Sequence, residues 1–151
     1  MRPPRNNPTP KGAYVLLVRL PRDETIPIGR LGFSRFRAGH YAYVGSALGG
    51  LRSRLDRHLR TEKRPRWHID YLLEKARLED IVTCETVARV ECAIADAMAM
   101  QFDSVPGFGC SDCRCRSHLF FSPGPMMPAV ISAARAMGLK PAVVDVRASR
   151  R

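Results

Sequence analysis

The chain has 151 residues, of which 45% are hydrophobic, so a wholly disordered chain is excluded and a single domain with its own core is expected. Its 25 Lys and Arg residues against 14 Asp and Glu give a net charge of +11 at pH 7, which favours a polyanionic partner, usually nucleic acid, over an effect on solubility alone. The longest stretch without Asp, Glu, Lys or Arg, residues 117–134, contains three prolines, so we expect no membrane span and no membrane partner.

The N-terminal sequence and the cysteines indicate the compartment. The first twelve residues contain no apolar segment of the kind found in secretory signals, so we expect a cytoplasmic protein. Five cysteines, an odd number, then favour reduced thiols over a disulfide scaffold. Residues 1–11 contain four prolines and are expected to form a disordered basic tail.

The first half of the chain predicts strands. Residues 13–20 are mostly apolar and β-branched up to Pro21, a pattern typical of a buried strand. Residues 26–36 combine alternating apolar side chains with two glycines and predict a second strand with a bulge or turn. Residues 40–45 predict a third short strand, and three successive strands with short connections predict an antiparallel meander.

Helices predominate in the rest of the chain. Leu51, Leu55 and Leu59 recur every four residues, which predicts an amphipathic helix over 51–60. The further expected elements are helices at 67–76, 87–102 and 126–137, strands at 78–83, 119–121 (a short edge strand) and 142–146, and a loop rich in Gly, Cys and Ser over 103–117. Strands first and helices afterwards predict an α+β domain, a small antiparallel sheet flanked by helices.

One carboxylate lies in an apolar helical stripe. At about 100° per residue, Val87, Ile94, Met98 and Phe102 share one narrow stripe of the 87–102 helix, and Glu91 lies inside it. A carboxylate facing a core is costly unless it is paired, protonated or bound to a metal. Two interpretations stay open, a structural salt bridge to one of the many arginines and a functional carboxylate.

A short basic segment concentrates the charge. Residues 49–66 contain seven Lys and Arg against two acidic residues, and the helix that follows the glycine pair offers an N-terminus that favours an anion. Arg54 and His58 lie one turn apart beside the leucine stripe. We expect this surface to contact a phosphodiester backbone, with a solvated basic face as the alternative. The expected nucleic-acid contacts are Arg52, Arg57, Arg60, Lys63 and Arg64.

The cysteines invite a comparison with zinc sites. The pattern Cys110-x-x-Cys113-x-Cys115-x-x-His118 crowds four candidate ligands into nine residues, whereas structural zinc usually takes ligands from two separated segments. Packed or hydrogen-bonded thiols are therefore favoured over zinc here. Cys84 and Cys92 are expected to be core residues.

Several motifs together resemble the GIY-YIG nuclease family. They are Gly12-Ala13-Tyr14 on the first strand, Tyr43-Val44-Gly45 ending a later strand, and the following helix with Arg54 and His58. The segments 41–47, 67–73 and 107–120 are similar to a small, mostly uncharacterised archaeal and bacterial branch of that family, whose members sometimes occur fused to repair glycosylases of the endonuclease III type. The resemblance covers residues 12–121, which we expect to form the nuclease domain, with 122–151 as a C-terminal extension containing one helix and a basic tail.

The resemblance implies a metal-dependent endonuclease acting on DNA, with RNA not excluded, and a link to DNA repair. It implies that Tyr14 is the general base or positions the water, that Tyr43 orients water or phosphate, and that Arg54 stabilises the pentavalent phosphate. His58, one turn on, matches a histidine often found at that place in the family. Glu91 would hold a single Mg²⁺ or Mn²⁺ ion. For Tyr14 to act as a base, its pKa must fall from about 10 to about 7, and Arg54 and the metal are the cations that could lower it.

Two other functions remain open. One is a non-catalytic nucleic-acid-binding module that has kept this fold and the basic surface. The other is a small interaction domain stabilised by zinc. Convergence of Tyr14, Arg54 and Glu91 in space favours catalysis over both.

Overall fold

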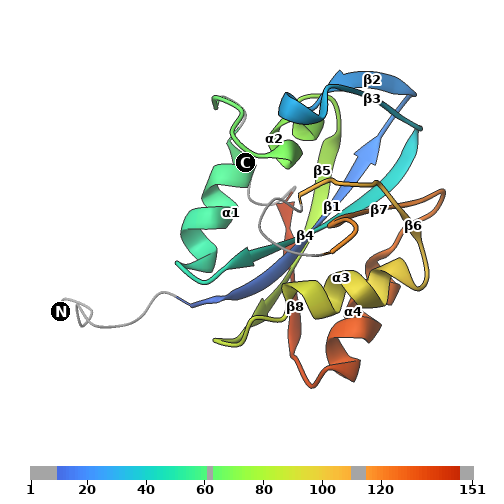
Figure 1. The fold of residues 1–151 in the computed structure, drawn as a ribbon. Coiled ribbons are helices and arrows are strands. Elements are labelled where there is room, and N and C mark those ends of the chain that lie inside the picture. The colour runs from blue at the N-terminus through green and yellow to red at the C-terminus, as the bar shows by residue number, and fades with distance from the viewer. Residues whose placement is uncertain (1–9, 61–62, 110–114, 147–151) are drawn as a thin grey trace.

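The computed structural model describes residues 10–60, 63–109 and 115–146, so almost all of the tail expected at 1–11 lies outside the described residues. Strand β1 (Gly12–Leu20) runs through the middle of the structure (Figure 1). Its side chains alternate between two apolar clusters, with Tyr14, Leu16 and Val18 in one and Val15 and Leu17 in the other. This burial on both faces explains why the strand is apolar without a polar side.

The main sheet has six strands, and each neighbouring pair is antiparallel. Its order is β6 (Asp103–Ser104), β7 (Leu119–Ser122), β4 (Gly39–Ala47), β1, β5 (Arg77–Glu85) and β8 (Pro141–Asp145). Helices α1 (Leu51–Leu59) and α2 (His68–Leu73) cover one face, and helices α3 (Glu91–Ala99) and α4 (Met127–Ala136) cover the other (Figure 1). The predicted α+β class, an antiparallel sheet flanked by helices, is confirmed. In the described part of the chain, no helix is long and apolar enough to cross a membrane.

The predicted meander is wrong. Residues 26–36 are not one strand but most of a hairpin, β2 (Glu24–Pro27) and β3 (Phe33–Phe36), which forms a separate two-stranded sheet. A short 3₁₀ turn, Gly29–Leu31, joins the two strands, and Gly29 and Gly32 adopt positive φ angles of 46° and 76° that break an extended chain. β1 therefore pairs directly with β4, and the hairpin leaves the sheet between them.

Three other expectations need correction. β7 is not an edge strand, because it pairs with both β4 and β6, and Phe120 at its centre is fully buried. α3 begins at Glu91 rather than Val87, whose side chain is 84% exposed and so lies on no buried stripe. The segment expected to be a loop over 103–117 begins with a short strand, β6. The described part of the C-terminal extension, up to Val146, contains the predicted helix as α4 and the predicted strand as β8, which pairs with β5 and completes the sheet.

Candidate active site

The pairing of β1 with β4 brings the two glycine–tyrosine tripeptides together. Tyr14 lies opposite Gly45 in the antiparallel register. A Cβ at Gly45 would overlap the ring and hydroxyl of Tyr14, so only glycine lets the Tyr14 side chain lie across this strand. Gly12 is restricted in the same way, because a Cβ there would overlap the carbonyl of Cys84 on β5. Close packing thus explains both glycines, Gly45 against the Tyr14 side chain and Gly12 against the β5 backbone.

Tyr14 and His58 form a buried pair. The Tyr14 hydroxyl lies 2.7 Å from His58 Nε2, and the side chains are 1% and 2% exposed. Burial raises the pKa of Tyr14 to about 12, although the charge and hydrogen bond of Arg54 act in the opposite direction. Burial, together with the charge of Lys63, lowers the pKa of His58 to about 3. At neutral pH the pair is therefore a phenol hydrogen-bonded to a neutral imidazole.

This state differs from the simple base expected of Tyr14. A tyrosine that acts as a base at neutral pH needs a pKa below its ordinary value of about 10. In the protein without a metal, the pKa of Tyr14 is raised instead, because desolvation of its side chain outweighs the charge of Arg54. The carboxylate of Glu91 raises the pKa of Tyr14 a little further, which shows that these two groups interact electrostatically. A cation bound at Glu91 would reverse the sign of that effect.

Trp67 supports the arginines of α1. The guanidinium carbons of Arg54 and Arg57 each lie 4.5 Å from the centre of the Trp67 ring, and the His58 ring lies 5.8 Å away. Arg57 also donates a hydrogen bond of 2.7 Å to the fully buried carboxylate of Asp70. Although burial raises it, the pKa of Asp70 lies below its ordinary value because hydrogen bonds from the Trp67 and Arg66 backbone and from Arg57 stabilise the charge.

Arg54, Glu91 and Tyr43 meet at one pocket of about 330 Å³. Gly45 and His118 also line this pocket, which lies where β4 leads into α1. Glu91 is the first residue of α3, where the helix dipole favours a carboxylate. Its Oε2 is buried and has no hydrogen-bond partner among the described residues, and none of their salt bridges includes it. Among the described residues, Glu91 therefore has no structural ion pair, which was one of its two open interpretations.

The five predicted catalytic residues thus occupy two connected layers. Tyr43, Arg54 and Glu91 line the pocket, whereas Tyr14 and His58 lie buried beneath it. Arg54 links the layers, because it lines the pocket and hydrogen-bonds to Tyr14. A carboxylate oxygen that has no partner among the described residues and shares a pocket with a guanidinium fits a hard divalent cation that also touches a phosphate.

The predicted nucleic-acid contacts fall into two groups. Arg52, Arg60 and Arg64 are exposed, as a backbone-contacting surface requires. Arg57 is committed to Asp70 and Trp67. Lys63 donates hydrogen bonds of 3.1 Å to three carbonyls at the end of α1, including that of His58, and so caps this helix. These two cations stabilise the scaffold of the site.

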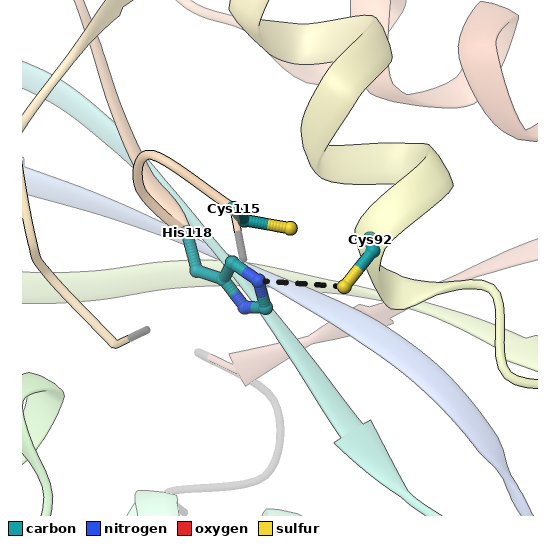
Figure 2. Close-up of side chains that lie close together, drawn as sticks. All are labelled: Cys92, Cys115 and His118. Atoms are coloured by element: carbon teal, nitrogen blue, oxygen red, sulfur yellow. Dashed lines mark hydrogen bonds between the residues drawn. The ribbon is translucent and has the colours of Figure 1, made fainter. Parts of the chain in front are cut away.

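A second cluster of reactive side chains borders the pocket. The ligand atoms of Cys92, Cys115 and His118 all lie within 4.8 Å of one another (Figure 2). Cys92 was expected in the core with Cys84, and this is wrong for Cys92, which is only half-buried and faces His118. Cys84 is buried as expected. Of the four residues in the crowded pattern, Cys110 and Cys113 lie outside the described residues.

Sequence reasoning missed Trp67 and Asp70 as supports of the site. A signal was present, because an acidic residue three positions after a helix start commonly bonds back to the preceding backbone, as Asp70 does to the Trp67 N–H at 3.0 Å. It also missed the contribution of Cys92, since a residue on a separate helix gives no spacing pattern with Cys115 and His118.

Comparison with known proteins places the chain in a family without a described activity. No curated protein and no solved structure matches it. A family model described as a domain of unknown function, DUF123, matches residues 13–139. The match spans Tyr14 and Glu91 and everything between them, and it ends after α4, before β8. Because the match covers far more than half of the 151 residues, the chain belongs to the DUF123 family.

Proposed function

We propose that this protein is a metal-dependent endonuclease of the GIY-YIG type that hydrolyses phosphodiester bonds in DNA. The observation that carries the proposal is the pocket lined by Arg54 and Glu91 beside the Tyr14–His58 pair, in which Oε2 of Glu91 has no hydrogen-bond partner among the described residues. Phosphodiester hydrolysis needs an activated water, charge neutralisation on the phosphoryl oxygens and help for the leaving oxygen. These residue types match those needs. The link to DNA repair rests on the resemblance alone.

Glu91 would hold the cation, Mg²⁺ or Mn²⁺. A hard ion bound by one carboxylate and completed by waters and substrate oxygens would supply charge neutralisation at the scissile phosphate. Arg54, opposite Glu91, would donate hydrogen bonds to the phosphoryl oxygens, whose charge grows in the transition state. The net charge of +11 would draw the polyanion toward this surface.

The buried pair gives Tyr14 a role other than that of a preformed phenolate. In this proposal the Tyr14 oxygen takes a proton from the attacking water while its own proton moves to His58 Nε2, 2.7 Å away. His58 is neutral beforehand and has a lone pair for this proton, although burial and the charge of Lys63, which lower its pKa to about 3, oppose the transfer. The negative charge of a bound phosphodiester would raise the pKa of His58 and favour this transfer. Tyr43, which lines the pocket, would orient the water.

One observation favours a second candidate, a nucleic-acid-binding module without catalysis. Tyr14 is only 1% exposed and its pKa is about 12, so it is reached by water only if the pocket wall at Gly45 lets water pass. A binding module would use the exposed arginines and leave the buried pair as a structural contact. The two functions differ in whether any phosphodiester bond is cut.

The test compares cleavage and binding in the same variants. The wild-type chain should cut branched, nicked or single-stranded DNA with Mg²⁺ or Mn²⁺. Glu91→Gln keeps the size of the side chain but removes the charge that anchors the cation, so cleavage should fall by at least about 100-fold while DNA affinity holds or rises. Arg54→Lys should lose cleavage to a similar degree, because a lysine does not reproduce the planar fork of the guanidinium.

Arg135→Lys is the matched control, since Arg135 is exposed on α4, on the other face of the sheet, and does not line the pocket. Its cleavage rate should stay close to that of the parent. A Glu91→Gln protein that cuts like the parent would overturn the metal assignment. A wild-type chain that binds DNA but cuts none of these substrates with either metal would establish the binding module instead.

A further inference from the structure

Three side chains from separate parts of the chain converge beside the pocket. Cys92 is the second residue of α3, whereas Cys115 and His118 lie in the segment that leads into β7 (Figure 2). Cys92 Sγ and His118 Nε2 are 4.0 Å apart, and all three ligand atoms lie within 4.8 Å of one another. Two sulfur atoms and an imidazole nitrogen facing a common point form a typical donor set for a transition metal.

The orientation of His118 is fixed by β4. Its backbone carbonyl accepts a hydrogen bond of 2.9 Å from the Val44 N–H, and its own N–H donates one of 2.8 Å to Phe108. Nδ1 of the ring lies 3.2 Å from the Val44 carbonyl oxygen. A carbonyl only accepts, so Nδ1 carries the proton and donates it, and the lone pair is left on Nε2, the atom that faces Cys92. Histidine ligands in metal sites are oriented in the same way.

We propose that Cys92, Cys115 and His118 supply three ligands of a zinc ion. A tetrahedral zinc ion, with bonds of ~2.3 Å to sulfur and ~2.0 Å to nitrogen, holds its ligand atoms about 3.5 to 3.8 Å apart. The atoms here need to close by roughly 1 Å from their limit of 4.8 Å, which rotation of the two cysteine side chains supplies. Thiolates and imidazole select zinc over Mg²⁺, so this site is chemically distinct from the one proposed at Glu91.

This ligand set answers the argument against zinc from spacing. That argument was that the cysteine–histidine pattern crowds its ligands into one short segment. Cys92 provides a ligand from α3, so the ion would join a helix on one face of the sheet to the segment before β7. Because the unfolded chain does not hold these ligands together, zinc binds the folded state and stabilises it.

The site has a consequence for the pocket. Cys92 directly follows Glu91, and His118 lines the same pocket as Glu91 and Arg54. The zinc ion would fix the first turn of α3 and with it the position of the Glu91 carboxylate. The zinc site does not depend on the proposed endonuclease activity, because its ligands and its measurement are separate from cleavage.

The experiment measures zinc directly on the full chain. Wild-type protein, stripped with a chelator under reducing conditions and titrated with ZnCl₂ against a chromophoric chelator, should bind one zinc ion per chain. Cys92→Ser and Cys115→Ser should each weaken zinc binding by at least about 10- to 100-fold. Cys84→Ser is the matched control, because Cys84 is buried in β5 and is not part of the cluster, and it should bind zinc like the parent.

Replacement of His118 separates a ligand from a packing residue. His118→Ala should lose tight zinc binding, and His118→Cys should restore most of it, since a thiolate is an equally good zinc ligand. A packing role would give no such rescue. Replacing zinc with Co²⁺ should also produce the visible and near-ultraviolet absorption of a thiolate-bound ion in the parent and in Cys84→Ser.

Folding of the variants is checked without metal. Zinc should raise the melting temperature of the wild-type chain in a concentration-dependent way and leave that of Cys92→Ser almost unchanged. The proposal is overturned if reduced wild-type protein takes up no stoichiometric zinc, or if Cys92→Ser and Cys84→Ser bind it equally well. It is also overturned if the two thiols of Cys92 and Cys115 are found joined as a disulfide that resists reduction in the folded protein.

Discussion

Asp70 is the buried charge on which the arginine side of the pocket depends, and Asp70→Asn should be strongly destabilising. Its side chain is fully buried, and Oδ2 accepts hydrogen bonds from Arg57 at 2.7 Å, from the Arg66 N–H at 2.9 Å and from the Trp67 N–H at 3.0 Å. Hydrogen bonds to a charged acceptor contribute about 1.5–3 kcal/mol each and neutral ones about 0.5–1.5, so neutralising the acceptor costs about 3 kcal/mol.

An unsatisfied hydrogen-bond donor would add to the cost of Asp70→Asn. Oδ1 of Asp70 is buried without a hydrogen-bond partner among the described residues, so the amide nitrogen of an asparagine would occupy that position as an unsatisfied donor. We therefore expect Asp70→Asn to lower the free energy of unfolding by about 3 to 5 kcal/mol, the range seen when one member of a buried ion pair is removed. With an m-value of about 2 kcal/mol/M, the midpoint of urea unfolding should fall by about 2 M.

The control is Asp56→Asn, because Asp56 is an exposed acid on α1. Its unfolding free energy should stay within about 0.5 kcal/mol of the parent. Since the pKa of folded Asp70 lies below the ordinary 3.8, its stabilisation is present above that pH and is lost as the pH falls further, so the parent and Asp70→Asn should converge in acid. An Asp70→Asn protein within about 1 kcal/mol of the parent at neutral pH would refute this account of the buried charge.

Three further changes have defined outcomes. Gly45→Ala should lower the melting temperature of the parent strongly and that of a Tyr14→Ala background much less, because the new methyl group overlaps the Tyr14 ring. An equal loss in both backgrounds would contradict the steric explanation. The free energy of unfolding should fall as the pH drops from 6.5 toward about 3, because unfolded His58 binds a proton in this range and folded His58 does not. His58→Gln should make the free energy of unfolding less dependent on pH in this range. An unchanged dependence would show that His58 is not the group responsible. Replacing the exposed Arg60 and Arg64 with alanine should weaken binding to DNA of every sequence. The plot of log Kobs against log salt concentration should become less steep, by up to about 1.8 for the two residues together. An unaltered slope would show that these arginines do not contact the DNA.

Local patterns were sufficient to predict most of the elements. The apolar run at 13–20 and the leucine repeat at 51–59 each specify one structure, because burial requires the period that the residues show. The 26–36 segment was misjudged because its glycines permit a reversal that side-chain alternation does not reveal. β7 was expected at an edge, and only the pairing of strands distant in sequence makes it an inner strand.

The candidate site, like the fold, could be predicted from the sequence only in part. Motif order identified Tyr43, Arg54 and Glu91, and the structure brings all three to one pocket. The protonation of Tyr14 was not predictable from sequence, because it depends on how completely the folded chain excludes water from the ring. The partners of Asp70 and Cys92 were missed for a related reason, since contacts between separate elements are set by packing and leave no spacing in the sequence.

The hairpin between β1 and β4 bears on how this fold could be shortened or extended. Leu20 pairs with Gly39, so the chain leaves the sheet and returns to it at the same rung of the ladder. A tight turn could therefore replace the whole excursion without altering the strand register. Packing opposes such a deletion, because Ile26, Ile28 and Phe36 of the excursion are buried in the core beside α2. The segment is thus an insertion in the topology of the sheet, but its side chains form part of the hydrophobic core. It should therefore tolerate added residues at its exposed tip, near Leu31 and Phe33, far better than deletion.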